Sequence, residues 1–122
     1  MISSYTVVVP MRLPSVANLR EHWAVKMRRA RAQRFAGRVA GTGARLVVPS
    51  PWAVTLTRIS PRPLDSDNLE MALKAVRDGV ADALELVSDR SPDATWKCEQ
   101  RRGGPGESAV EISVAHREDN EP

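Results

Sequence analysis

The chain has 122 residues, of which 18 are lysine or arginine, 15 are aspartate or glutamate, and one is cysteine. This length predicts a single small domain, which we expect over residues 1–115, followed by a polar tail over residues 116–122. A single cysteine excludes an internal disulfide, and no apolar run of about 18 residues or basic leader is present. These features exclude a membrane span and predict a cytoplasmic protein.

Charge is distributed unevenly along the sequence. Residues 1–62 contain 11 lysines and arginines against one acid, whereas residues 63–122 contain 7 against 14 acids. The two halves therefore carry net charges of +10 and −7. Such polarity within one domain indicates a surface for a polyanion such as nucleic acid, set against an acidic site or tail.

The first half predicts a strand and a long basic helix. The β-branched run at residues 5–9 is typical of a buried strand. A helix is expected over residues 19–39 and is stopped by the glycines of residues 41–43; we expect Trp23 in the core. Its basic side chains are candidates for contacting nucleic-acid phosphates, although they could equally form an ordinary solvated face. Together with two hairpin arginines, the candidate nucleic-acid-binding residues are Asn18, Arg20, Lys26, Arg28, Arg29, Arg31, Arg34, Arg101 and Arg102.

The remaining strands are predicted from alternation and turn residues. Residues 46–48 could form a short strand, and residues 52–59 alternate as a half-buried strand. Residues 95–102 and 108–115 are predicted strands joined by a hairpin turn at the glycine-rich residues 103–106. The expected fold is a single α/β (α+β) domain with a mixed or antiparallel sheet of four or five strands and two main helices.

An apolar stripe at helical spacing, Leu69, Leu73, Val76, Val80 and Leu84, predicts a second helix. Two carboxylates stand together in the stretch LDSDNL, where this helix begins. In an extended segment Asp65 and Asp67 would point to the same side, and paired carboxylates are typically held by a proton or a cation. Mg²⁺ is often bound by only one or two carboxylates, with water and phosphate completing its shell. Alternatively, Asp67 is a helix N-cap that forms a capping box with Glu70, and Asp65 is a turn residue.

Further charged residues follow along the second helix. Lys74 lies seven residues after Asp67, which is two helical turns, so both project from nearly the same side. Lys74 could also form an ordinary ion pair with Asp78, four residues further on. Asp89 follows in a turn beyond the helix, and it can meet Asp65 and Asp67 only if the chain folds back.

These motifs together resemble a known family. The runs LDSDNL and LKAVRDGVADAL, an acidic turn, and TWKCEQRRGGPGESAVEISV are similar to the RusA family of Holliday junction resolvases and its phage relatives. The resemblance is strongest over Pro61 to Val114. It implies a RusA-like fold with a closing β-hairpin, a homodimer, and metal-binding catalytic carboxylates at Asp65, Asp67 and Asp89. It also implies an active-site lysine at Lys74.

Two departures from the family pattern are present. The acidic turn, often a pair of aspartates in the family, is Ser88-Asp89 here, and the lysine is shifted by about one helical turn. A DNA-junction-binding protein on the same scaffold with weak or lost cleavage is therefore the alternative function. A third hypothesis is a globular interaction protein that binds no nucleic acid.

The expected function is a Mg²⁺-dependent, or alternatively Mn²⁺-dependent, endodeoxyribonuclease that resolves four-way DNA junctions in a bacterial or phage-infected cell. The three acids would hold the metal, which activates water, and Lys74 would stabilise charge on the scissile phosphate. The sequence contains no Walker-type phosphate loop, so no nucleotide cofactor is expected.

Overall fold

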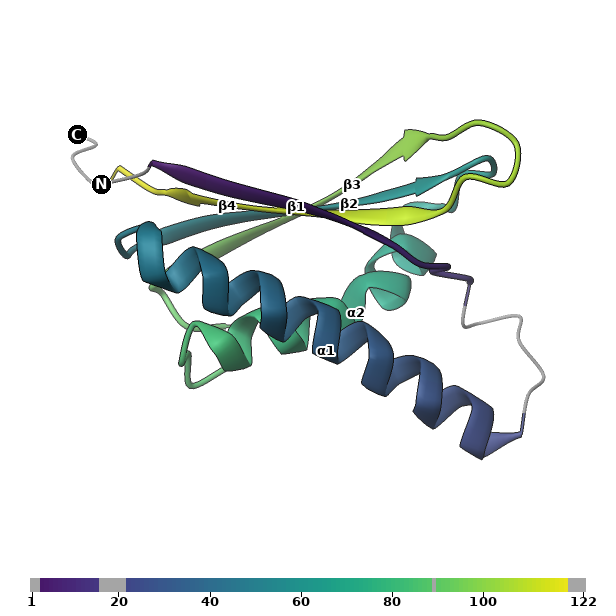
Figure 1. The fold of residues 1–122 in the computed structure, drawn as a ribbon, viewed down its shortest axis with the longest axis horizontal. Helices are drawn as coiled ribbons and strands as arrows, with labels where there is room; N and C mark the ends of the chain where they lie inside the picture. The colour runs from purple at the N-terminus through teal and green to yellow at the C-terminus, as the bar shows by residue number, and fades with distance from the viewer. Residues whose placement is uncertain (1–2, 16–21, 89, 119–122) are drawn as a thin grey trace.

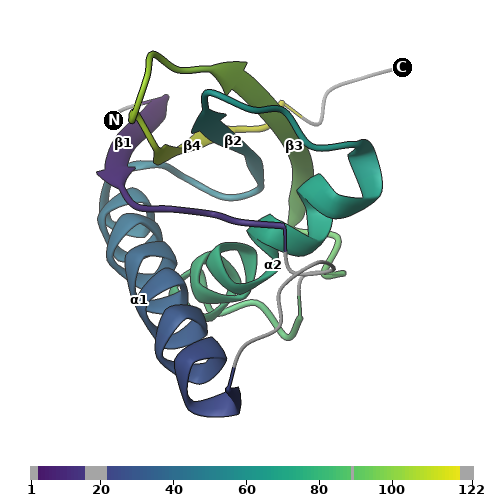
Figure 2. The ribbon, with the colours of Figure 1, turned by 90° about the vertical axis from the view of Figure 1, so that its right-hand side faces the viewer.

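A computed structural model describes residues 3–15, 22–88 and 90–118, and places two helices on one face of a four-stranded sheet (Figures 1 and 2). The elements are β1 (Ser4–Pro10), α1 (Trp23–Val47), β2 (Trp52–Ser60), α2 (Ser66–Ala83), β3 (Ala94–Arg102) and β4 (Ala109–His116). The expected α+β class, with a mixed sheet and two main helices, is confirmed. In the described part of the chain, neither helix is long and apolar enough to cross a membrane.

The strands are arranged in the order β1-β4-β2-β3, and the hairpin expected between β3 and β4 is wrong. β4 is antiparallel to both β1 and β2, whereas β3 pairs in parallel with β2. The connection from β3 to β4 passes the end of β2, where the Gly103 amide donates to the Ser60 carbonyl oxygen at 3.0 Å. β4 is central because its aliphatic residues are fully buried, while the more charged β3 forms an edge.

Helix α1 is longer than the sequence predicts. It does not stop at residues 41–43, and residues 46–48 form its last turn and C-cap rather than a strand. The small residues serve helix packing instead, since a Cβ on Gly41 would lie 2.7 Å from the Ala83 Cβ of α2. The helix ends where the Val48 amide donates to the Ala44 carbonyl oxygen at 2.7 Å.

The expectation that Trp23 lies in the core is wrong. Its side chain is 67% exposed, because the first turns of α1 project beyond the sheet, as Figure 1 shows at the lower right. His22 precedes it as the N-cap, and its Nδ1 accepts from the Ala24 amide at 3.2 Å. The projecting turns therefore carry exposed side chains, among them several of the candidate nucleic-acid-binding residues.

The core lies between the helices and the sheet. The largest fully buried side chains are Leu56, Leu73, Ile112, Val54, Val76, Val80, Val110 and Val114. The two helices also touch through glycines, with Gly37 and Gly41 against α2 and Gly79 against α1. Helix α2 is therefore fixed against both the sheet and α1, and this packing sets the position of its N-terminus.

Candidate functional site

Asp65 is the N-cap of α2. Its Oδ1 accepts from the Asn68 amide at 2.9 Å, and its Oδ2 accepts from the Asn68 side-chain amide at 3.1 Å. The helix begins at Ser66, so the alternative in which Asp67 caps the helix and pairs with Glu70 in a capping box is wrong. The physical reason is position: a capping oxygen reaches the amides two or three residues ahead, and only Asp65 precedes the first helical residue.

Asp67 lies in the first turn of α2, so the extended arrangement predicted for the two acids is also wrong. Both acids are nevertheless exposed and lie at the same end of α2. Among the described residues the carboxylate of Asp67 makes no hydrogen bond or ion pair. It is therefore available to a cation, and Asp65 keeps unused lone pairs on both oxygens.

The end of β3 supports the segment that leads into this site. Gln100 holds Leu64 by two hydrogen bonds: its Oε1 accepts from the Leu64 amide at 2.9 Å, and its Nε2 donates to the Leu64 carbonyl oxygen at 2.6 Å. Arg101 and Arg102 follow directly and are exposed. Arg101 lies 3.4 Å from the Glu111 carboxylate, which is a loose ion pair. Two of the predicted nucleic-acid-binding residues therefore follow directly after the residue that anchors Leu64.

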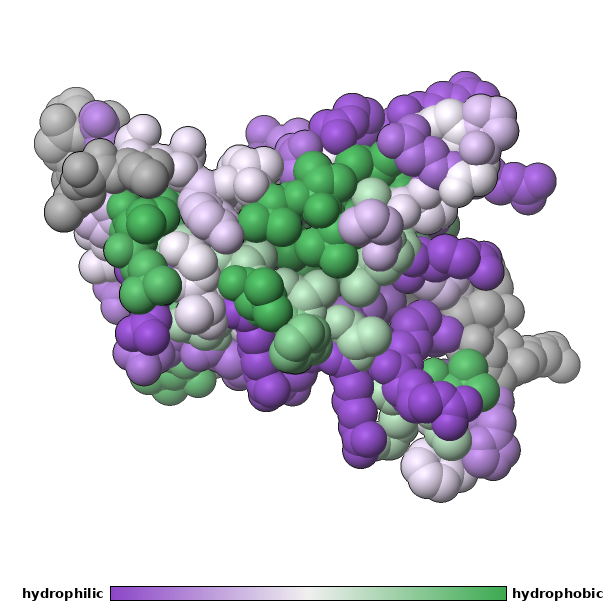
Figure 3. Space-filling view, viewed as in Figure 1, coloured by the Kyte–Doolittle hydropathy of each residue, from purple (hydrophilic) through white to green (hydrophobic). Residues whose placement is uncertain are grey.

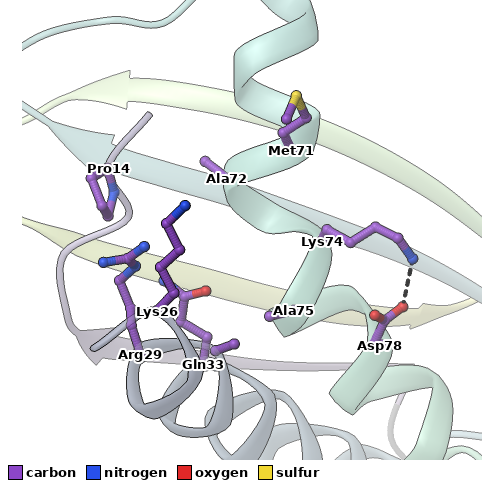
Figure 4. A pocket seen from close by; sticks show the side chains of 10 residues that line it. Pro14, Lys26, Arg29, Gln33, Met71, Ala72, Lys74, Ala75 and Asp78 are labelled. Carbon is purple, nitrogen blue, oxygen red and sulfur yellow. Dashed lines mark hydrogen bonds and ion pairs between the residues drawn. The ribbon is translucent and has the colours of Figure 1, made fainter. Parts of the chain in front are cut away.

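Lys74 lies in a groove of about 330 Å³ between α1 and α2, shown in Figure 4. Its Nζ is 2.9 Å from Oδ1 of Asp78, as the ion-pair alternative predicts. Lys26 and Arg29 of α1 line the same groove, and Figure 4 shows Arg29 extending toward Pro14. The structure thus brings the predicted active-site lysine together with two residues of the predicted nucleic-acid-binding helix.

The other basic residues of α1 differ in whether they form ion pairs with described residues. Arg34 forms a two-pronged pair with Asp82 of α2, with Nε and Nη2 donating at 2.8 and 3.1 Å. This hydrogen bond lowers the pKa of Asp82, and Arg38 reinforces it. Arg34 therefore serves first to join the helices. Arg28 and Arg31 are exposed and make no hydrogen bond or ion pair with the described residues.

Three predicted site residues, Asp89, Asn18 and Arg20, lie outside the described residues. Within residues 3–15, 22–88 and 90–118, no three histidine, cysteine, aspartate or glutamate side chains gather as potential metal ligands. A metal site at Asp65 and Asp67 would therefore have two carboxylates among the described residues. Two carboxylates are sufficient for Mg²⁺, which usually keeps several waters and binds substrate phosphate.

Ser88 and Arg90 follow the far end of α2. The 18 residues of this helix span about 27 Å. The Ser88 carbonyl oxygen accepts from the Ser91 amide, and Ala94 then pairs with Trp52 at the start of β2, whereas Asp65 follows the end of β2. In one chain, Ser88 and Arg90 are thus at the opposite end of α2 from Asp65.

Comparison with known proteins adds no assignment to this site. No protein-family model matches the chain, and no curated protein matches its sequence. The resemblance to RusA resolvases therefore stays a prediction.

We expect replacement of Asp65 by alanine to lower the free energy of unfolding by about 1 kcal/mol, because the cap of α2 is lost. Asp65→Asn should retain most of this stability, since asparagine caps helices as well as aspartate. Urea denaturation of both variants measures the difference. Asp67→Ala is the matched control, and its change should stay within about 0.5 kcal/mol. Equal losses in Asp65→Asn and Asp65→Ala would contradict the capping role.

Proposed function

We propose that this chain is a Mg²⁺- or Mn²⁺-dependent endodeoxyribonuclease that resolves four-way DNA junctions in the cytoplasm of a bacterial or phage-infected cell. The proposal rests on the carboxylate of Asp67, which is exposed in the first turn of α2, two residues after Asp65, and makes no hydrogen bond or ion pair with the described residues. Arg101 and Arg102 at the end of β3 would neutralise DNA phosphates that extend from this site.

The chemistry follows from these side chains. Asp65 and Asp67 would hold the metal, which when bound supplies an activated water and stabilises charge on the phosphate. Gln100 keeps the preceding residue Leu64 in place, so the start of α2, which carries the two carboxylates, is anchored to the end of β3. Arg101 and Arg102 would bind the non-bridging oxygens of neighbouring phosphates and orient the scissile bond.

The groove between the helices supports a path for the DNA backbone. Lys26, Arg29 and Lys74 line it, and Lys74 lies about 10 Å along α2 from Asp67. Asp78 lines the groove as well, so three cations and one carboxylate leave a net charge of +2, which favours a polyanion that continues along α2. In this arrangement Lys74 contributes to strand binding while it remains close to Asp78.

A homodimer is part of the proposal, because a two-fold symmetric junction requires two symmetric cuts. The face that carries β1 and α1 has an apolar patch, seen in Figure 3. The exposed large apolar residues of these two elements are Val8, Trp23, Val25, Met27, Phe35, Val39 and Leu46. Apolar surface of this kind is typical of protein contacts and supports self-association.

A second candidate is a junction-binding protein without cleavage. It is favoured by the pairing of Lys74 with Asp78, and by the position of Ser88 at the opposite end of α2 from Asp65. With two acids only, the site at Asp65 and Asp67 would hold a metal more weakly than a site with three.

The test is a nicking assay on a synthetic four-way junction and a linear duplex of matched sequence, with Mg²⁺ or with EDTA. We expect symmetric nicks in the junction only, and only with Mg²⁺. Tight junction binding without nicks in either condition would instead support the binding protein. Equal and weak binding of junction and duplex at physiological salt would remove both candidates.

A further inference from the structure

A second basic pocket, of about 350 Å³, lies between the segment that precedes α1 and the segment that links β2 to α2. Arg12, Arg58 and Arg62 line it, together with Ser15. None of these four belongs to the residues that the sequence motifs single out. Leu64 also lines the pocket, and Asp65 follows it directly, so the pocket adjoins the carboxylate end of α2.

Arg58 is buried, with only 7% of its surface exposed. It occupies the inward-facing phase of β2, in line with Val54 and Leu56 of the core. Its Nε donates to the Leu13 carbonyl oxygen at 2.7 Å, and its Nη1 donates to the Arg62 carbonyl oxygen at 2.7 Å. These two bonds fix the plane of the guanidinium between the two segments that form the pocket.

The charge of Arg58 has no anionic partner in the described part of the chain. No carboxylate there lies within ion-pair distance, and burial alone lowers the pKa of its guanidinium. Arginine nevertheless stays protonated, and an uncompensated buried charge is costly. Its Nη2 makes no hydrogen bond with the described residues, so it can donate to a ligand in the pocket.

Two further features favour an anionic ligand in this pocket. The Oγ of Ser15 is buried and has no hydrogen-bond partner among the described residues. The side chains of Arg12 and Arg62 are exposed and make no hydrogen bond or ion pair there. A tetrahedral oxyanion would accept hydrogen bonds from the Ser15 hydroxyl and from several guanidinium N–H groups at once. It would give the hydroxyl a partner and compensate the positive charge of Arg58.

We propose that this pocket binds a backbone phosphodiester of DNA, next to the phosphate that would be cut at Asp65 and Asp67. The identity of this ligand rests on the proposed function, whereas the anion-binding character of the pocket does not. The volume lies at the lower end for ligand pockets and suits one phosphate with its sugar. The pocket would fix the register of the strand relative to the carboxylates.

The test uses Arg12→Gln and Arg62→Gln, because Arg58 holds two segments and its replacement could unfold the chain. Junction binding is measured in EDTA, so that no cleavage occurs, over a range of salt concentrations. Each variant should bind about tenfold more weakly and should lower the slope of log K against log salt by about one. Arg45→Gln is the matched control, since Arg45 pairs with Glu85 at the other end of α1. It should leave the slope unchanged.

The outcomes separate this proposal from the proposed function. If the wild type binds the junction and all three variants keep its salt slope, the pocket assignment is wrong while the nuclease proposal stands. If the wild type binds no DNA, the phosphodiester assignment fails together with the nuclease. The Tm is then measured with inorganic phosphate. A rise in the Tm of the wild type that is smaller in Arg62→Gln identifies a pocket for free phosphate, and no rise means that the pocket binds no phosphate.

Discussion

Replacing Gly79 by alanine should destabilise the protein by about 3 kcal/mol, although alanine is the better helix former. A Cβ at this position would overlap the Arg34 carbonyl oxygen and would lie 2.9 Å from the Arg34 carbonyl carbon and 3.0 Å from the Arg38 nitrogen. All three are backbone atoms, so no rotamer change can relieve the overlap. The gain in helix propensity, about 1 kcal/mol, is smaller than the cost of forcing the helices apart.

Thermal unfolding measures this effect, and we expect Tm to fall by about 10 °C or more. Gly104→Ala is the matched control, because a Cβ there meets only Glu107 Oε1, at 3.8 Å, and the residue does not have a positive φ. Its Tm should change by no more than a few degrees. A Gly79→Ala variant as stable as the wild type would mean that α1 and α2 do not approach closely at this residue.

The close packing of α1 against α2 also explains why the sequence predicts the end of α1 poorly. Residues 41–43 form a glycine-rich run, which locally indicates a helix end. The residue that makes Gly41 useful inside a helix is Ala83, which is distant in sequence. By contrast, the strand over residues 52–60 and helix α2 were predicted well, because alternation and helical spacing are local signals.

The sequence contains a signal against the predicted hairpin between β3 and β4. Residues 52–102 follow the order strand, helix, strand, which is the pattern of a βαβ unit with two adjacent parallel strands. In such a unit β3 pairs with β2, and the glycine-rich turn must lead past β2 rather than back along β3. The local turn signal was therefore outweighed by the crossover geometry of α2.

The candidate site was predicted in part. The sequence places Asp65 and Asp67 at the start of a helix, and the structure agrees. The N-cap is Asp65 and not Asp67, because the capping residue is the one that comes directly before the first helical turn. Arg58 was missed, although it stands at an inward position of an alternating strand. A charged residue on the buried phase of a strand is a signal that sequence analysis could use.

Asp67→Asn should abolish metal-dependent cleavage, with a loss of about a thousandfold or more, while folding and DNA binding persist. The substitution removes the one carboxylate of the pair that is not occupied with capping, and a metal-bound transition state is worth several kcal/mol. The N-cap at Asp65 remains, so the Tm should stay close to the wild-type value. Initial rates of junction nicking in Mg²⁺, with junction binding in EDTA, measure both parts of this expectation.

Glu70→Gln is the matched control for Asp67→Asn, because it removes one exposed negative charge from the same helix, three residues further along. Its nicking rate should remain within a few-fold of the wild type. In EDTA, Asp67→Asn should bind the junction at least as tightly as the wild type, since a negative charge near the phosphates is gone. If Asp67→Asn and Glu70→Gln nick equally fast, the metal is held elsewhere and the D-x-D motif is only a helix start. If both variants lose activity equally, the loss comes from the change in net charge and not from a lost metal ligand. A coordinated metal would distinguish Asp67 from Glu70 by geometry.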